Sequence, residues 1–261
     1  MPDSEKSMQP SFKRVPAVDK TFAILDLLAQ TNTSMGVSEI TRALAFNKST
    51  VFNITHTLAD LEILKQAPDN KFSLGIKFYL LGRAARMGSD IISTIHPYLE
   101  TIHQKTHLSV FLGVRSGLHA VIVDKVDADF DIKISSETGM RLPLLAGAGG
   151  KAMLSLMPDQ EIDRILSENG LKRYTRYSVV DKAKYKRMLK KTQQEGFAVD
   201  KEEYIEGIRA LAVPLNINRG NAQFAIWAVG LKGQISDDVI GSYAELLKRF
   251  GREIQIQLAS D

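Results

Sequence analysis

The sequence predicts an α+β protein built from two domains that differ in secondary structure. Its 261 residues are 44% hydrophobic and 25% charged, an ordinary globular composition, and the length suits one large or two modest domains. Residues 15–75 carry three short helical patterns followed by a hairpin. From residue 90 onward, helices are mixed with strands that arrive in hairpin-like clusters. This mixture is typical of an antiparallel sheet covered by helices.

Three helices are expected in the first domain. The first ends before the polar segment 32–36, and its apolar residues recur at helical spacing. These residues are Val18, Phe22, Leu25 and Leu28. Ser38 can cap the second helix, over residues 39–45, and Asn47 can cap the third. One face of the third helix is expected to turn inward, and it consists of Val51, Ile54, Leu58 and Leu61.

A hairpin and a connecting helix follow the three helices. Residues 65–67 and 71–74 are two short extended runs, and the Pro-Asp-Asn segment between them is a turn signal. The helical pattern that begins at Ile76 stops at a Gly-Ser pair, so residues 76–89 are expected to form a linker helix. Residues 1–14 are expected to form a flexible arm ahead of the first domain.

The second domain, residues 90–261, should mix helices with the strands of an antiparallel sheet. The expected helices cover residues 90–106, with Pro97 as a kink, and then 149–156, 160–168, 182–195 and 237–258. The expected strands cover residues 110–114, 120–126, 132–135, 197–200, 208–215 and 223–231.

Composition excludes several classes of site. The chain has no cysteine, which excludes a disulfide framework, a thiolate zinc site, an iron–sulfur cluster and a cysteine nucleophile. Residues 1–12 contain no signal-peptide core, and no apolar stretch approaches the roughly 18 residues that span a bilayer. We therefore expect a cytoplasmic protein that does not enter a membrane. The net charge of +4 permits an anionic partner.

The helices of the first domain form the first arrangement that points to a function. A recognition helix enters the major groove of DNA by its N-terminal turns, where donors to base edges and phosphates are needed. The third helix begins with such donors, and its first backbone amides add a site for phosphate. The outward positions expected to face DNA are Lys48, Ser49, Thr50, Phe52, Asn53 and His56. Lys65 and Lys71 of the hairpin are expected to contact phosphate. An ordinary N-cap on a solvated helix is the alternative interpretation.

A glycine-rich segment, residues 147–152, forms the second arrangement. It superficially fits the G-x-G-x-x-A motif of dinucleotide sites, but Pro143 interrupts the preceding strand and no βαβ pattern surrounds it. A Walker A motif fails, because Leu145 and Ala152 stand where that motif needs Gly and Ser or Thr. Glycines at a helix start still let backbone amides approach a carboxylate or a similar anion. A plain tight turn is the alternative.

From about Val15 to Leu258 the chain resembles the IclR family of bacterial transcription regulators. The resemblance rests on ordered stretches of sequence, at residues 37–40 with 47–52, 71–75, 142–144 with 148–152, and 196–203 with 207–209 and 212–214. It implies an N-terminal winged helix-turn-helix domain and a C-terminal GAF-like α/β effector domain with an antiparallel sheet. Ser38 is also among the expected DNA-binding residues. The family usually has arginine where this chain has Asn53, so that contact is lost or exchanged for amide readout of adenine.

The resemblance also implies an effector site. In relatives, two backbone amides of the glycine-rich loop hold the effector's carboxylate, and Ala148 and Gly149 match them. The other matching positions are Asp200, Ala210, Trp227 and Val229, with Ile134 on a strand that faces the site. Relatives that bind small keto acids have polar residues where this chain has Ala210, Trp227 and Val229. We therefore expect a dry pocket that prefers aromatic or longer aliphatic acids. A simple core role is the alternative for Trp227.

These features predict the partners of the chain. The expected partners are double-stranded DNA with a palindromic operator and a small carboxylate effector. The chain is also expected to bind further copies of itself, as a dimer or a dimer of dimers. A stripe on the connecting helix, formed by Phe78, Leu81 and Ala85, is expected to pack on the partner copy. No cofactor is expected.

Two other functional classes are weighed against a ligand-responsive regulator. An enzyme that acts on a small organic acid would need a nucleophile and base, metal ligands or a phosphate loop. His103 and His107 have the spacing of zinc ligands but no third ligand, and Glu202, Glu203 and Glu206 are expected to be solvated acids in a turn. We therefore expect neither a metal site nor catalysis. A DNA-binding scaffold with a vestigial pocket is the third class.

Overall fold

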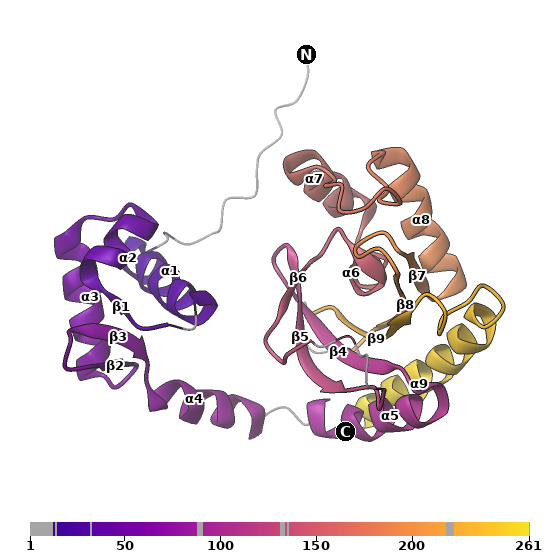
Figure 1. Ribbon diagram of the computed structural model, residues 1–261, viewed down its shortest axis with the longest axis horizontal. Helices are drawn as coiled ribbons and strands as arrows, with labels where there is room; N and C mark the ends of the chain where they lie inside the picture. The colour runs from indigo at the N-terminus through magenta and orange to yellow at the C-terminus, as the bar shows by residue number, and fades with distance from the viewer. Residues whose placement is uncertain are drawn as a thin grey trace, which may run out of the picture. The chain divides into compact units, whose positions relative to one another are not determined.

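The computed structural model divides the chain into two compact units, Met1–Ser89 and Asp90–Asp261 (Figure 1). It describes residues 13, 15–31, 33–87, 91–130, 134, 136–217 and 222–260. The expected N-terminal arm, residues 1–14, therefore lies outside the described residues apart from Lys13. Each unit has its own buried core.

The first unit contains four helices and a small antiparallel sheet among its described residues. Its elements are α1 (Pro16–Thr31), β1 (Met35–Gly36), α2 (Val37–Leu44), α3 (Lys48–Asp60), β2 (Leu64–Gln66), β3 (Lys71–Leu74) and α4 (Ile76–Met87). The strand order is β1-β3-β2, so the hairpin gains a third, very short strand from the segment before α2. Helices α2 and α3 with this hairpin make a winged helix-turn-helix.

The ends of α2 and α3 differ from the predicted caps. Gly36 occupies the N-cap of α2, and its backbone amide donates to the Glu39 carboxylate at 2.7 Å, so Ser38 lies inside the helix and does not cap it. Asn47 does occupy the N-cap of α3 in an extended backbone conformation, but its side chain makes no capping hydrogen bond. Helix α2 ends at Leu44, and the left-handed backbone of its C-cap residue Ala45 (φ +53°) turns the chain toward α3.

The core of the first unit takes only part of the apolar pattern predicted for α1. Ile24, Leu25 and Leu28 are buried, whereas Val18 and Phe22 are 51% and 60% exposed. The spacing of the apolar residues fits two faces of the helix, and tertiary packing selects the one that contains Ile24. In α3, Val51 and Leu58 are buried as predicted, Ile54 is partly buried, Leu61 is exposed, and Thr55 fills the remaining inward position.

Thr55 is tolerated in the core because its hydroxyl donates to the Val51 carbonyl at 2.9 Å.

The stripe expected on α4 is exposed only in part. Phe78 packs against the core of the same unit and does not belong to an exposed stripe. Leu81 is exposed as expected, and the side chain of Ala85 lies outside the described residues.

The second unit is a six-stranded antiparallel sheet between two layers of helices. Its elements are α5 (Ile91–Thr106), β4 (Ser109–Ser116), β5 (His119–Val126), β6 (Arg141–Pro143), α6 (Gly147–Leu154), α7 (Asp159–Asn169), α8 (Lys182–Glu195), β7 (Ala198–Lys201), β8 (Ile208–Leu215), β9 (Phe224–Leu231) and α9 (Ile240–Ser260). The strand order is β6-β5-β4-β9-β8-β7. The sequence therefore predicted the α+β class and the antiparallel sheet correctly.

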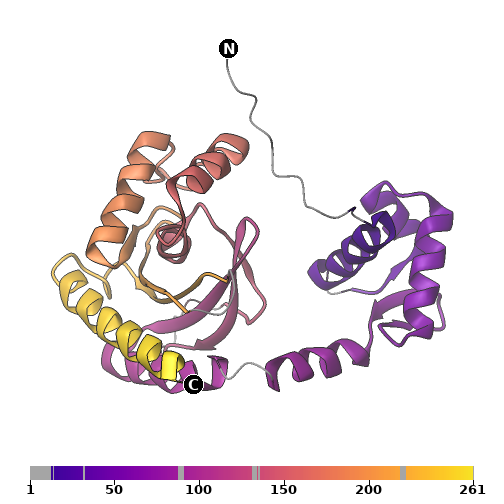
Figure 2. The ribbon, with the colours of Figure 1, turned by 180° about the vertical axis from the view of Figure 1, so that it is seen from behind.

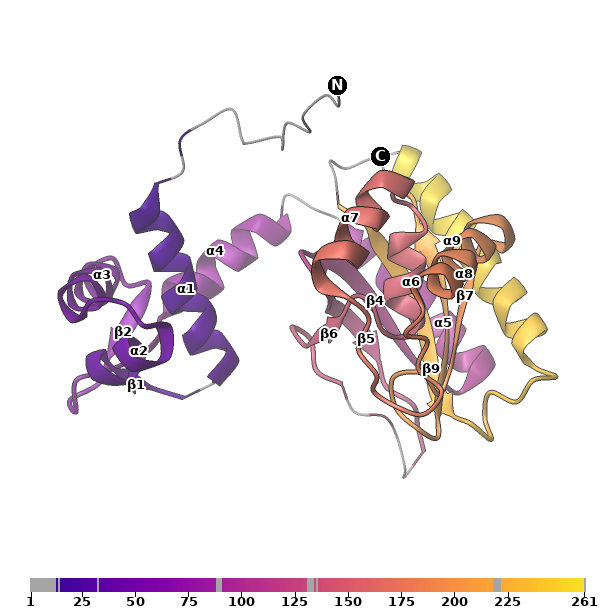
Figure 3. The same cartoon turned by 90° about the horizontal axis from the view of Figure 1, so that it is seen from above.

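Each face of the sheet has its own apolar core. Side chains of β4, β8 and β9 that alternate along the strands pack on one face against α5 and α9. Figures 2 and 3 show α9 running along this face. On the other face, Trp227, Phe111 and three alanines of β8 and β9 pack beneath α6 with α7 and α8. Small residues on β8 let α6 approach the sheet closely.

Several element boundaries differ from the prediction. The strand expected at residues 132–135 falls mostly outside the described residues, and Ile134 has no regular structure; the strand beside β5 is β6 instead. Helix α6 begins at Gly147, two residues before the predicted start, and α9 begins at Ile240, three residues after it. Pro97 lies within α5. In the described part of the chain, no helix combines the length and hydropathy needed to cross a bilayer.

Candidate functional site

The second unit encloses a cavity between its sheet and α6. The cavity holds about 640 Å³ of empty space when its open, solvent-filled mouth is included. The polar side chains on its wall are Ser136, Asp200 and Tyr204, and Trp227 adds an indole N–H. The other lining residues are Phe111, Ala120, Ile134, Leu142, Ala146, Gly147, Ala148, Gly149, Gly150, Ile205, Ile208, Ala210 and Val229. The cavity is therefore mostly apolar.

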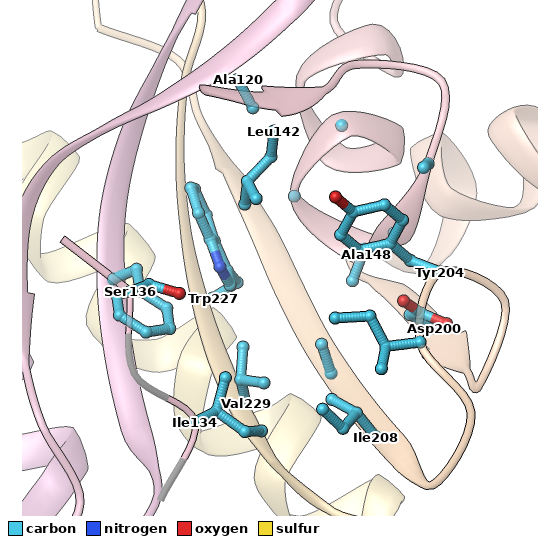
Figure 4. A pocket seen from close by; sticks show the side chains of 17 residues that line it. Ala120, Ile134, Ser136, Leu142, Ala148, Asp200, Tyr204, Ile208, Trp227 and Val229 are labelled. Atoms are coloured by element: carbon cyan, nitrogen blue, oxygen red, sulfur yellow. The ribbon is translucent and has the colours of Figure 1, made fainter. Parts of the chain in front are cut away.

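The register of the sheet sets the floor of the cavity. Asp200 on β7 pairs with Ala210 on β8, and Ala210 pairs in turn with Val229 on β9. Cross-strand partners project to the same face, so these three side chains form a row across the sheet. Trp227 lies two residues before Val229 and therefore projects to the same face. Figure 4 shows Trp227 and Val229 on β9 facing Ala148, Asp200 and Tyr204.

The start of α6 forms the opposite wall. Gly147 has a left-handed backbone (φ +73°), which is readily adopted only by glycine and which turns the chain into the helix. The first backbone amides of a helix have no partner within it, so those at Ala148 and Gly149 are suited to an anion. Both residues line the cavity.

Glycines also let the Trp227 indole fit between α6 and β4. A Cβ atom at Gly113 would lie 2.3 Å from the indole Cη2, and one at Gly149 would lie 3.0 Å from Cε3. The indole is 3% exposed, and its centroid lies 5.9 Å from that of Phe111. Trp227 is thus both a core residue and part of the cavity wall, and the two interpretations of this tryptophan are compatible.

Asp200 is the titratable group at the ligand-facing end of α6. Its Oδ1 accepts a hydrogen bond from the Glu203 amide at 2.6 Å, and its Oδ2 lies near Gly147, 3.5 Å from where a Cβ would stand. Burial raises the pKa of Asp200 to about 6, because a desolvated carboxylate is disfavoured. The Glu203 charge raises this pKa further, and Lys151 opposes the rise.

Carboxylate binding should therefore depend on pH through Asp200. A bound carboxylate would add negative charge beside Asp200 and raise its pKa, so binding takes up a proton. Affinity should fall by up to about tenfold per pH unit as the pH rises from 6 toward 8, where a ligand of pKa about 4 stays ionised. Calorimetry in buffers of different ionisation enthalpy measures both effects. Asp200→Asn should flatten the profile; a wild-type profile as flat as that of Asp200→Asn would show that no carboxylate binds beside Asp200.

Behind the cavity, Lys151 forms a buried ion pair. Its side chain is 1% exposed, and Nζ donates to Glu203 Oε1 at 2.6 Å and to the Val199 carbonyl at 2.5 Å. Glu202 is also buried; its carboxylate lies 2.8 Å from Lys232 Nζ and 3.8 Å from Arg209. The prediction that Glu202 and Glu203 are solvated was wrong, since the β7–β8 turn folds both against cations of other elements. Glu206 is exposed.

The structure brings all seven predicted effector residues to one cavity. Ile134, Ala148, Gly149, Asp200, Ala210, Trp227 and Val229 each line it. Sequence reasoning missed Tyr204 and Ile205 of the β7–β8 turn, which line the same wall. Tyr204 is held by an edge-to-face contact with Tyr174, at a centroid distance of 5.0 Å. Nothing in the sequence signals this contact, because thirty residues separate the two tyrosines.

The predicted DNA-binding residues lie on α2, α3 and the adjoining hairpin. Ser38, Lys48, Ser49, Phe52 and Asn53 are exposed, and Thr50 and His56 are partly exposed. Lys65 on β2 is exposed, and the Lys71 side chain on β3 is 43% exposed, with Nζ 3.9 Å from Asp69. An ion pair this long and exposed contributes little and leaves Lys71 able to bind phosphate.

His103 and His107 do not form the expected pair on one helix, because α5 ends at Thr106 and His107 follows it with a left-handed backbone (φ +57°). His103 is buried; its Nδ1 lies 2.9 Å from the Leu108 carbonyl and its Nε2 3.0 Å from Asp129. Both ring nitrogens are therefore engaged, and neither is available to a metal together with His107. The described residues contain no group of three or more potential metal-binding side chains.

Comparisons with known proteins agree with this arrangement. The helix-turn-helix model of the IclR family matches residues 17–68, and the model for the C-terminal part of bacterial IclR transcriptional regulators matches residues 84–256. The HTH-type transcriptional repressor AllR of Escherichia coli K12 is 26% identical over 247 residues, which cover 94% of this chain and 91% of AllR.

Solved structures share the whole fold. The crystal structure of IclR from Thermotoga maritima is 26% identical with a TM-score of 0.67, over 94% of this chain and 99% of that one. An IclR homolog from Microbacterium hydrocarbonoxydans, crystallised with 4-hydroxybenzoate, is 21% identical with a TM-score of 0.78, over 94% of this chain and 100% of that one.

A winged helix-turn-helix unit joined to a unit with a mostly apolar cavity at a helix start defines a class of protein, the ligand-responsive transcription regulators. Within that class, the chain belongs to the IclR family of bacterial transcription regulators. It is an IclR-type regulator with a C-terminal effector-binding domain, as the resemblance in sequence predicted.

Proposed function

We propose that this regulator binds a small aromatic or apolar carboxylic acid in the cavity beneath α6 and that the acid alters its binding to an operator. The observation that carries the proposal is the pairing of the α6 amides at Ala148 and Gly149 with an apolar floor made by Ala210, Trp227 and Val229. The amides suit a carboxylate, and the floor suits an apolar body. The 4-hydroxybenzoate of the Microbacterium relative is an acid of this kind.

The apolar floor sets the expected preference among acids. A hydroxyl or keto group of a very small acid would face Ala210 and Val229 without a partner, at a cost of about 1–3 kcal/mol for each group. A phenyl ring or an alkyl chain gains roughly 25 cal/mol for each Å² that it buries there. A hydroxyl or amide of the ligand that reached Asp200 would donate a hydrogen bond to it.

Calorimetry with a panel of acids tests this proposal. Benzoate and medium-length aliphatic acids should bind more tightly than glyoxylate or pyruvate. Val229→Thr keeps the shape of the side chain but places a hydroxyl in the floor of the cavity. It should therefore reduce the difference in affinity between benzoate and glyoxylate. Val180→Thr, at a half-exposed position outside the cavity, is the matched control and should leave the affinity for each acid unchanged. Tightest binding to glyoxylate by the wild-type chain would refute the proposed ligand class.

We further propose that α3 reads the operator and that the hairpin holds its backbone. Asn53 is exposed on the outward face of α3, where its amide could pair with adenine, and Lys71 stands on the wing. Asn53→Ala should cost about 1–3 kcal/mol on the specific site and little on other DNA. Lys71→Ala should weaken binding to all sequences and lower the salt dependence by about one counterion. Fluorescence anisotropy at several salt concentrations separates the two effects, and equal losses on specific and nonspecific DNA in both variants would contradict this assignment.

The operator proposed is palindromic, because the regulator is proposed to act as a dimer or a dimer of dimers. Exposed apolar side chains on α4 support self-association. They are Ile76, Tyr79, Leu80 and Leu81, each at least half exposed. Val18 and Phe22 on α1 add to the exposed apolar surface of the same unit. Light scattering should report the dimer or the larger assembly at micromolar concentration.

Binding without turnover completes the proposal. The cavity wall offers one carboxylate and the hydroxyls of Ser136 and Tyr204, with no histidine or lysine among its lining residues to act as a base. A bound acid should therefore be recovered chemically unchanged after long incubation with the protein. The proposed place of action is the cytoplasm, where the bacterial operator is.

A further inference from the structure

Helix α3 presents two stripes of side chains at i, i+4 spacing on its outward face. One stripe carries Lys48, Phe52 and His56, and the neighbouring stripe carries Ser49, Asn53 and Thr57. Phe52 is 50% exposed, so a large apolar ring stands in the middle of an otherwise polar face. Burial within the unit does not explain this position.

The Phe52 ring is held in place from below. The His56 imidazole stacks on it, with ring centroids 3.9 Å apart and planes 30° apart. His56 Nδ1 lies 2.9 Å from the Phe52 carbonyl, which can only accept, so this nitrogen donates. The imidazole also meets the edge of Phe72 at 5.3 Å, and Phe72 is fully buried in the wing. Phe52 is thus an exposed ring supported by the core of its unit.

We propose that Phe52 reads the C5-methyl group of a thymine in each half-site, as a specificity-determining residue; this inference rests on the proposed operator binding by α3. The thymine methyl is the apolar group that base pairs present in the major groove. The same ring placed against cytosine would cover its amino donor without accepting a hydrogen bond from it, which is unfavourable. A supported ring loses little conformational freedom when it binds.

The neighbouring stripe favours the same kind of base pair. Asn53 is adjacent to Phe52, and an amide side chain pairs bidentately with adenine. Thr57 directs its hydroxyl to the Asn53 carbonyl at 2.7 Å, so that hydroxyl is not available as a donor to bases. Phe52 and Asn53 together therefore favour A·T pairs at the centre of the contact made by α3.

Deoxyuridine scanning tests the inference, because deoxyuridine differs from thymidine only by the methyl group. Binding sites are first selected from random-sequence duplexes with the full-length chain, and each thymine is then replaced in turn. One thymine in each half-site should lose about fourfold in affinity, which corresponds to the roughly 0.8 kcal/mol of one buried methyl or methylene group. Phe52→Ala should bind the thymine and uracil duplexes equally. His56→Ala, which removes the support, should show a smaller thymine preference than the wild type.

Leu61→Ala is the matched control. Leu61 is an equally exposed apolar residue at the other end of α3, and its removal should leave the fourfold thymine preference unchanged. A wild-type chain indifferent to every thymine methyl, or a Phe52→Ala variant that keeps the preference, would overturn the inference while operator binding stands. Failure of the wild-type chain to enrich any duplex would instead overturn the proposed function on which it rests.

Discussion

Lys151→Met should lower the free energy of unfolding of the effector domain by about 3–5 kcal/mol. The substitution keeps most of the side-chain volume but leaves Glu203 without its cation, and the Glu203 side chain is only 13% exposed. Breaking a buried ion pair on one side has this cost because the remaining charge stays desolvated. Urea denaturation followed by the fluorescence of Trp227, the single tryptophan, measures the change in this domain.

Two further variants make this result specific. Glu203→Gln combined with Lys151→Met removes both charges and should recover a large part of the loss, since no buried charge is then left unpaired. Lys191→Met breaks an exposed pair with Glu195, at 3.7 Å, and should change the stability by less than about 1 kcal/mol. Equal effects of Lys151→Met and Lys191→Met would show that the buried pair does not stabilise the domain.

Gly150→Ala should be comparably damaging and should also abolish effector binding. A Cβ atom at this position would lie 1.9 Å from the Leu144 carbonyl oxygen, which is backbone and has no rotamer to relieve the overlap. Helix α6 must move away from the β6–α6 connection, at a cost of about 3 kcal/mol or more. The amides of Ala148 and Gly149 move with the helix, so the anion site is displaced.

Gly241→Ala is the control for Gly150→Ala. Gly241 lies in α9, and a Cβ atom there would meet nothing within 4 Å. Alanine in an open helical position should leave the stability unchanged or raise it by up to about 1 kcal/mol. Thermal denaturation and calorimetry with benzoate measure stability and binding in both variants. Retained benzoate affinity in Gly150→Ala would contradict the location of the anion site at α6.

Much of the fold follows from local patterns. Apolar spacing and turn residues located the helices of both units and the hairpin at residues 65–74 because these signals lie within a few residues of one another. The errors arose where distant packing decides. The α1 residues Val18 and Phe22 fit the helical pattern, yet the core takes the face of Ile24. Likewise, β6 is three residues long and is defined by its pairing with β5.

Part of the site was also predictable, because some of its signals are local in the sequence. The glycine-rich helix start is a local signal, and the resemblance to a known family placed the strand positions that face it. The Lys151–Glu203 pair joins residues 52 positions apart, and no local pattern reveals it. The close approach of Trp227 to Gly113 depends on the register of β4 with β9, which the sequence does not specify by itself.

Occupation of the cavity beneath α6 is expected to change how the winged helix-turn-helix binds its operator. Anisotropy of a selected operator duplex, titrated with the full-length chain in the presence and absence of saturating benzoate, tests it most directly. Benzoate should change the operator affinity by about fivefold or more, and operator should change the benzoate affinity by the same factor. Gly150→Ala should remove both changes. An operator affinity that stays the same while calorimetry shows benzoate bound would show that the cavity does not control DNA binding.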